Sequence, residues 1–219
     1  MLLHTVVMVV ATLSAQELLD RSIAYHDPHG QFESGAFQIA LSESRPNGAD
    51  RKTSVTIDNG SGRFEMTREA DTGASTHLVT RGDEVETNSD ADLPDDRALR
   101  TRNYYAYLYG LPMKLRDPGT KLAPDAKETT FRDQKAWELK VTYDESVGQD
   151  TWYFYLDPTT YALIGYRFYH DESKNDGEYI TLEGEAQGAG LRLPKIRNWY
   201  RHADEGHLGT DTIVSIKEP

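Results

Sequence analysis

The sequence contains no cysteine, and this absence removes several chemistries at once. Disulfides, thiol catalysis, iron–sulfur clusters and cysteine-ligated zinc are excluded, and we expect no lipid-modified N-terminal cysteine. Basic residues are also few, since 24 Lys and Arg stand against 36 Asp and Glu, which gives a net charge of −12. Nucleic acids and anionic membrane surfaces bind basic faces of proteins. The charge balance therefore argues against both as partners.

The sequence also lacks the common catalytic motifs. It contains no Gly-X-Ser-X-Gly, no phosphate-binding loop and no dinucleotide fingerprint. His26, Asp27 and His29 are residue types that bind zinc. Pro28 breaks the helix between the two histidines, however, so they do not share a face as ligands on a helix do. We therefore expect a turn here, with no catalytic residue, no metal and no cofactor; a metal-dependent hydrolase that uses these three residues is the alternative.

The N-terminus has the layout of a secretory signal peptide. An apolar run at 2–10 is followed by mostly small residues at 11–15, ending in Ser14 and Ala15. The run is too short for a transmembrane helix, which needs about 20 residues. We predict that 1–15 is a signal peptide cut after Ser14 or Ala15, and that the protein is periplasmic or secreted. The alternative is a buried first strand or helix of the fold.

Alternating residues in the middle of the chain give the clearest structural signal. Trp137, Leu139 and Val141 are separated by polar residues, which is the period of two of a strand with one buried face. Two later segments repeat the pattern on either side of Asp157-Pro158. These two residues favour a turn, because proline fixes φ and the aspartate side chain can accept from the backbone two residues on. The pattern predicts three antiparallel strands.

The rest of the sequence predicts a mainly β fold of the α+β class. About eleven strands are expected, at 35–42, 53–58, 63–67, 76–80, 129–131, 137–143, 152–156, 162–168, 177–185, 191–202 and 209–216. Two helices are expected, one near the N-terminus from residue 16 and one that is rich in tyrosine from residue 97. No βαβ rhythm is visible. We therefore predict that 16–219 forms a single domain, a strongly curved antiparallel sheet or half-barrel with the tyrosine-rich helix on its concave side.

The tyrosine-rich helix is the unusual element, because Tyr104, Tyr105, Tyr107 and Tyr109 fall within six positions. One interpretation is that it fills the concave side of the sheet, with hydroxyl groups that reach polar partners at the rim. The other is that helix and sheet leave a cavity in which an apolar ligand is buried. The side chains predicted to contact that ligand are Tyr104, Tyr107, Leu108 and Leu111 on the helix and Trp137, Leu139 and Trp152 on the sheet.

Several short segments carry a resemblance to a known family. They are AYHDP at 24–28, DRK at 50–52, RNYY at 102–105, YLYGLPMKL at 107–115, KVTYD at 140–144 and DTWYF at 150–154. With them the chain resembles a family of bacterial envelope proteins that is classed as a domain of unknown function. That family is in turn similar to the lipoprotein-carrier (LolA/LolB-like) superfamily, through its N-terminal helix, antiparallel sheet and inserted helix. The resemblance implies a half-barrel around a lipid cavity, and it implies no catalytic residue.

The sequence therefore favours an exported, non-enzymatic envelope protein that binds a lipid or another apolar small molecule in the hollow of its sheet. Two alternatives remain: the metal-dependent hydrolase described above, and a structural interaction module with a filled core. Beyond the apolar run at the N-terminus, no segment is apolar enough to be expected to span a membrane. The sequence does not identify a protein partner.

Overall fold

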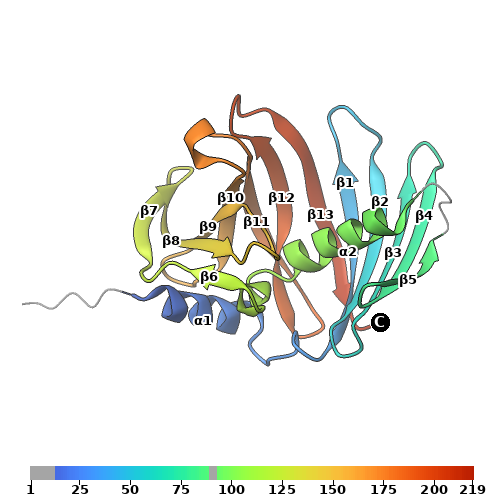
Figure 1. Ribbon diagram of the computed structural model, residues 1–219, viewed down its shortest axis with the longest axis horizontal. Coiled ribbons are helices and arrows are strands. Elements are labelled where there is room, and N and C mark those ends of the chain that lie inside the picture. The colour runs from blue at the N-terminus through green and yellow to red at the C-terminus, as the bar shows by residue number, and fades with distance from the viewer. Residues whose placement is uncertain (1–12, 89–92) are drawn as a thin grey trace, which may run out of the picture.

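The structure is a computed structural model that describes residues 13–88 and 93–219. Most of the predicted signal peptide, including its apolar run, lies outside these residues. Thirteen strands and two α-helices run through the described part of the chain (Figure 1). The strands are β1 (Ala36–Ser44), β2 (Arg51–Asp58), β3 (Arg63–Ala70), β4 (Ser75–Arg81), β5 (Glu84–Asn88), β6 (Thr120–Leu122), β7 (Lys127–Phe131), β8 (Gln134–Tyr143), β9 (Thr151–Leu156), β10 (Leu163–Tyr169), β11 (Glu178–Gly188), β12 (Leu191–Arg201) and β13 (His207–Lys217).

All of these strands belong to one antiparallel sheet with the order β5-β4-β3-β2-β1-β13-β12-β11-β10-β9-β8-β6, and β7 pairs with β8 beside that path. The first and last strands, β1 and β13, are neighbours in the middle of the sheet, with Ser42 opposite Thr212. Neighbouring strands elsewhere follow one another in the chain, except at β6 and β8. This contact between the two ends of the chain is the longest-range pairing of the fold.

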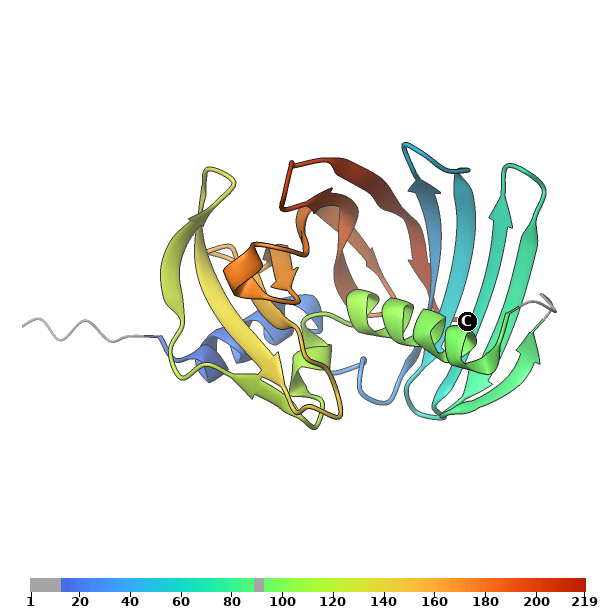
Figure 2. The same cartoon turned by 45° about the horizontal axis from the view of Figure 1, so that its top comes forward.

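The predicted mainly β class is confirmed, but two details of the prediction were wrong. The sheet has 13 strands where about eleven were predicted, and it is not strongly curled where a strongly curved sheet or half-barrel was predicted. Two separate helices cover different parts of one face, so the sheet does not have to wrap around a single helix (Figure 2).

The two strands that the prediction omitted are β5 and β6. The sequence of β5, Glu-Val-Glu-Thr-Asn, has a single apolar residue, and β6 has only three residues. Neither is long or apolar enough to show a period of two. Both form because a longer neighbour offers its edge: β5 pairs with β4, and β6 pairs with β8.

Helix α1 (Ala15–His26) begins at a capping box. The Ser14 hydroxyl accepts from the backbone N–H of Glu17, and the Glu17 carboxylate accepts from the backbone N–H of Ser14. Leu18, Leu19 and Ile23 lie on its buried face, which packs against β8 and β12. The helix ends at His26, two residues before Pro28.

Helix α2 (Asp95–Tyr109) contains the four tyrosines and lies across the other part of the same face, next to β4 and β5 (Figures 1 and 2). Ala98, Tyr105, Leu108 and Tyr109 are its buried residues. After Gly110 the chain turns into a short 3-10 helix, η1 (Met113–Arg116), and a second one, η2 (Glu172–Lys174), lies between β10 and β11. The buried side chains of α1 and α2 belong to one hydrophobic cluster, so both helices face the same core.

Candidate functional site

A cavity of about 640 Å³ lies between the C-terminal half of α2 and strands β8 to β12. Six of its sixteen lining residues are aromatic. The aromatic side chains that line it are Tyr104, Tyr107, Tyr143, Trp152, Phe168 and Trp199. They come from α2 and from four strands, so only the folded sheet brings them together.

Trp152 lies at the centre of these contacts. Its ring stacks on Phe168, with ring centroids 4.8 Å apart, and on Phe154 at 5.8 Å. The edge of Tyr107 approaches it from α2 at 5.5 Å. Trp152 and Phe154 share the inner face of β9 because alternate residues of a strand point to the same side. This stacking holds one wall of the cavity rigid and apolar.

The two tyrosines at the end of α2 and β8 give this wall a polar group. The hydroxyl groups of Tyr107 and Tyr143 form a hydrogen bond with each other. Burial raises the pKa of Tyr143 to about 12 and raises the pKa of Tyr107 well above its ordinary value. Both phenols therefore stay protonated near neutral pH. They suit the role of hydrogen-bond partners in a binding site better than that of a base.

The open side of the cavity carries charged groups. Lys114 forms an ion pair with Asp117, and His170 Nδ1 lies 2.7 Å from Asp150 Oδ1. The hydrogen bond to Asp150 raises the pKa of His170, and burial raises the pKa of Glu178 on β11. The cavity thus has aromatic walls and a polar mouth, which is the usual distribution in sites for small amphiphilic molecules.

Four of the seven predicted ligand-contacting residues line this cavity: Tyr104, Tyr107, Leu108 and Trp152. Leu111 does not, because α2 ends at Tyr109 and the helical spacing no longer holds beyond it. Leu111 is buried in the core at 1% exposure.

Trp137 and Leu139 also lie away from the cavity. They have the predicted alternation on β8, but Trp137 is opposite Leu156 on β9, while Val141 is opposite Trp152. The cavity lies at the Trp152 end of this strand pair. Leu139 is buried in the core and Trp137 packs against it.

Sequence reasoning missed Tyr143, Phe168 and Trp199 as lining residues. Phe168 belongs to one of the predicted alternating segments, so its inward direction was visible in the sequence. Trp199 stacks on Tyr104, with ring centroids 5.9 Å apart. Nothing in the local sequence of β12 indicates that contact, because 95 positions separate the two residues.

The alternative metal site around His26 is occupied by structural hydrogen bonds. His26 Nδ1–H donates to the Arg192 carbonyl at 2.5 Å, and Nε2 accepts from the Leu163 N–H at 2.9 Å. The carboxylate of Asp27 accepts from two backbone N–H groups of the following turn. Both ring nitrogens are therefore used, and within 13–88 and 93–219 no group of three or more His, Asp or Glu residues is placed to hold a metal ion.

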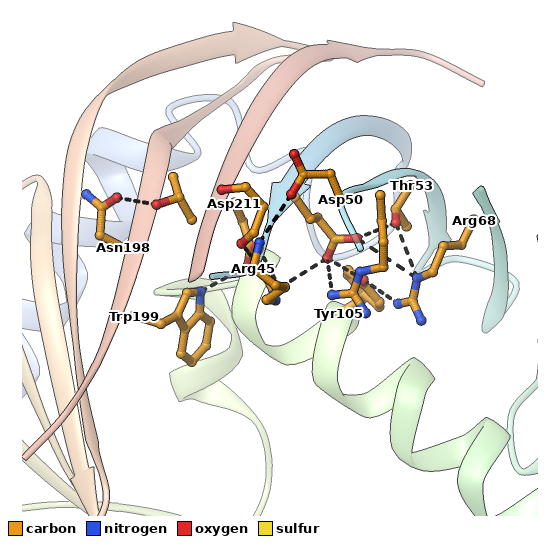
Figure 3. Close-up of polar contacts among 12 residues, drawn as sticks. Arg45, Asp50, Thr53, Arg68, Tyr105, Asn198, Trp199 and Asp211 are labelled. Carbon is orange, nitrogen blue, oxygen red and sulfur yellow. Dashed lines mark hydrogen bonds and ion pairs between the residues drawn. The ribbon is translucent and has the colours of Figure 1, made fainter. Parts of the chain in front are cut away.

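A polar cluster lies on the other flank of α2 (Figure 3). At its centre is Glu43 on β1, which is fully buried. Its carboxylate accepts from the Thr53 hydroxyl at 2.5 Å and from the Tyr105 hydroxyl at 2.8 Å. Two arginines of neighbouring strands, Arg51 and Arg68, lie 3.4 and 3.9 Å from it. One carboxylate thus joins three strands to α2.

A second buried carboxylate, Asp211 on β13, extends the cluster. Arg45 pairs with Asp211 at 2.7 Å and lies 3.6 Å from Glu43, so it links the two acids. Asp211 also accepts from the indole N–H of Trp199 at 3.0 Å. Figure 3 shows Trp199 beside Asp211. Because Trp199 also lines the aromatic cavity, the cluster and the cavity share a wall.

Among the described residues, the helices are too short and too polar to cross a lipid bilayer.

Comparisons with known proteins identify the family and the fold. A family model described as a family of unknown function, DUF6503, matches residues 1–216. No curated protein matches the sequence. A solved LolA superfamily protein from Nitrosomonas europaea has a TM-score of 0.56 at 11% identity, with 94% of each chain covered.

Two further solved structures have the same fold. A domain described as an outer membrane lipoprotein-sorting protein, from Vibrio parahaemolyticus, has a TM-score of 0.50 at 11% identity, covering 92% of this chain and 89% of that one. A DUF1329 family protein from Desulfovibrio piger has a TM-score of 0.51 at 11% identity, with 94% of each chain covered. At this level of identity the likeness is one of fold alone.

Proposed function

The chain belongs to DUF6503, a family of unknown function, and we propose that it is an exported, non-enzymatic envelope protein that binds a lipid or another apolar molecule in the aromatic cavity. The observation that carries this proposal is the cavity itself. Its volume of about 640 Å³ falls within the range of roughly 300–1,000 Å³ that is typical of small-molecule sites. The six aromatic side chains in its walls suit an apolar chain.

The energy of such binding would come from burial of apolar surface. Each methylene group removed from water contributes about 0.8 kcal/mol, so a chain of about ten methylenes contributes about 8 kcal/mol before the entropy of association is subtracted. The hydroxyl groups of Tyr107 and Tyr143 offer a polar contact inside the cavity. The likeness in fold to a LolA superfamily protein supports a carrier-like role.

Leu108→Trp tests whether the cavity is the binding site. Leu108 is buried and lines the cavity, so the larger indole has open space to enter. We expect the variant to remain nearly as stable as the parent. It should bind a fluorescently labelled fatty acid about tenfold more weakly, because the indole displaces about two methylene groups of the ligand from the cavity. Thermal melts and fluorescence titrations measure the two quantities.

Leu139→Trp is the matched control. Leu139 is buried in the core and does not line the cavity, so the same substitution overpacks a filled site and is expected to cost about 1–3 kcal/mol. Labelled fatty acid should still bind to the folded fraction of this variant. If the parent protein binds no fatty acid and both variants are equally destabilised, the interior is filled and the interaction-module alternative is correct.

The proposed export predicts a processed N-terminus. Protein recovered from the periplasm or the medium is expected to begin at Ala15 or Gln16. Loss of Ser14 removes the side-chain cap of α1, which is typically worth about 1 kcal/mol, so the processed chain should melt slightly below the unprocessed one. N-terminal sequencing and thermal melts measure both effects. An intact Met1 on the recovered protein would contradict the predicted signal peptide.

A further inference from the structure

A depression of about 280 Å³ lies between α2 and strands β2 and β3, and it shares one lining residue, Tyr104, with the aromatic cavity. Four arginines line it: Arg51, Arg68, Arg97 and Arg100. The other lining residues are Thr101, Tyr104 and Tyr105. A grouping of four guanidinium groups is notable in a chain whose net charge is −12.

Two of these arginines are held in place by hydrogen bonds to side chains in the buried polar cluster. Arg68 donates from Nη2 to the Tyr105 hydroxyl at 2.6 Å and from Nε to the Thr53 hydroxyl at 3.4 Å. Arg51 donates from Nη2 to Glu43 at 3.4 Å. Its Nε is buried and has no hydrogen-bond partner among the described residues. The buried Glu43 therefore orients these arginines but does not use all of their donors.

The local charge is positive. Arg45 belongs to the same network, and four of the five arginines, all but Arg97, form ion pairs with three carboxylates, those of Glu43, Asp211 and Asp96. The arginines therefore outnumber their carboxylate partners by two. The guanidinium of Arg97 is exposed and forms no ion pair within the described chain.

We propose that this depression, which we call the arginine pocket, binds a phosphate group. Guanidinium groups present planar pairs of N–H donors that match phosphate oxygens in a bidentate manner. Donors that approach from two strands and from a helix suit a tetrahedral group with several equivalent oxygens better than a flat carboxylate with two. The pocket is several times the volume of one water molecule, about 30 Å³ in the liquid, so it has room for such a group.

The arginine pocket adjoins the proposed lipid site. Tyr104 lines both the pocket and the aromatic cavity, and Tyr105 beneath it bonds to both Glu43 and Arg68. The phosphate is therefore either a free ion or the headgroup of an amphiphile whose chain enters the cavity. The inference about the pocket does not depend on the proposed function, because it rests only on the arginines.

Titration with inorganic phosphate at constant ionic strength tests the pocket. Isothermal titration calorimetry on the full chain should show saturable binding of one phosphate. Arg97→Gln should weaken this binding about tenfold, because it removes one charge-assisted hydrogen bond from an exposed residue on which the fold does not depend. Arg81→Gln, on β4 and outside the pocket, changes the net charge equally and should leave the affinity unchanged. Absence of saturable binding, or an equal loss in both variants, would overturn the proposal.

A second arm identifies the source of the phosphate. Dodecyl phosphate below its micellar concentration is compared with inorganic phosphate on the parent protein and on Leu108→Trp. If the ligand is an amphiphile, the dodecyl chain should tighten binding at least tenfold in the parent, and Leu108→Trp should remove that gain. If the two ligands bind equally tightly and Arg97→Gln weakens both, the pocket is a site for free phosphate. In that case the cavity proposal has failed and the pocket proposal has not.

Discussion

Replacing Glu43 with alanine is expected to lower the free energy of unfolding by about 3–5 kcal/mol. The side chain is fully buried and lies within 3.9 Å of three arginines. Its removal leaves Arg51 and Arg68 without the carboxylate that compensates for their burial, and it leaves the Tyr105 hydroxyl without its acceptor. Breaking such a pair from one side costs more than the pair itself contributes, because the remaining guanidinium groups are still about three-quarters buried without a carboxylate partner.

Glu65→Ala is the matched control for this substitution. Glu65, on β3, is also paired with a cation, since Arg63 lies 2.8 Å away, but its side chain is about one-third exposed. Exposed ion pairs contribute about 0–1 kcal/mol, so this variant should unfold at nearly the parent urea concentration. Urea titrations of the three proteins give the comparison. If Glu43→Ala costs no more than Glu65→Ala, Glu43 does not hold the arginines as described.

The stability of the protein is expected to fall by about 3 kcal/mol between pH 6.5 and pH 4 through His26 alone. Burial lowers the pKa of His26 from 6.5 to about 4. In this window the unfolded chain binds a proton at His26 and the folded chain does not, so lowering the pH favours unfolding. The stability that depends on a neutral His26 is fully present above pH 6.5 and is lost as the pH falls toward 4. Below pH 4 it does not change further. A shift of one pKa unit corresponds to about 1.4 kcal/mol, so the difference between 6.5 and about 4 gives the expected loss of about 3 kcal/mol.

His26→Gln isolates this effect, since other groups titrate in the same range. The variant lacks the ionisable group, so its free energy of unfolding should depend on pH less steeply than that of the parent, by about 3 kcal/mol over the window. His29→Gln is the control, because His29 is exposed, and it should keep the parent's pH dependence. Urea unfolding at several pH values measures the slopes. Equal slopes for parent and His26→Gln, or one zinc per chain by elemental analysis, would contradict the structural role of His26.

The structure shows how His26 stabilises the fold, although the residues around it in the sequence indicated only a turn. The ring joins the end of α1 to the Arg192 carbonyl of β12 and to the N–H of Leu163 on β10. These partners lie 166 and 137 positions away in the chain. Local sequence showed the break at Pro28 correctly. It carried no signal for partners so distant.

Features with short-range causes were predictable from the sequence. Asp157 accepts from the backbone N–H groups of Thr159 and Thr160 at 2.9 and 2.7 Å, as its position in the predicted turn requires. The strand character of β8, β9 and β10 and the start of α1 follow from residues a few positions apart. The burial of β9 does not alternate as predicted, because Tyr155 on its other face is buried against Phe131 of β7. The prediction missed β5 and β6. These two strands form mainly because their backbones pair with β4 and β8, and their own residues show no strand pattern.

The sequence by itself determined the mainly β class, the two helices and the tyrosine-rich character of α2, because side-chain period, capping residues and turn residues act over a few positions. The tertiary structure alone decided which tyrosine faces which side. Tyr105 bonds to Glu43, 62 positions away, while Tyr104 stacks on Trp199 between the two pockets. Both contacts follow from the pairing of β1 with β13, which closes the chain on itself. A local pattern does not specify that pairing, and so it does not specify the cavity or the arginine pocket on either side of it.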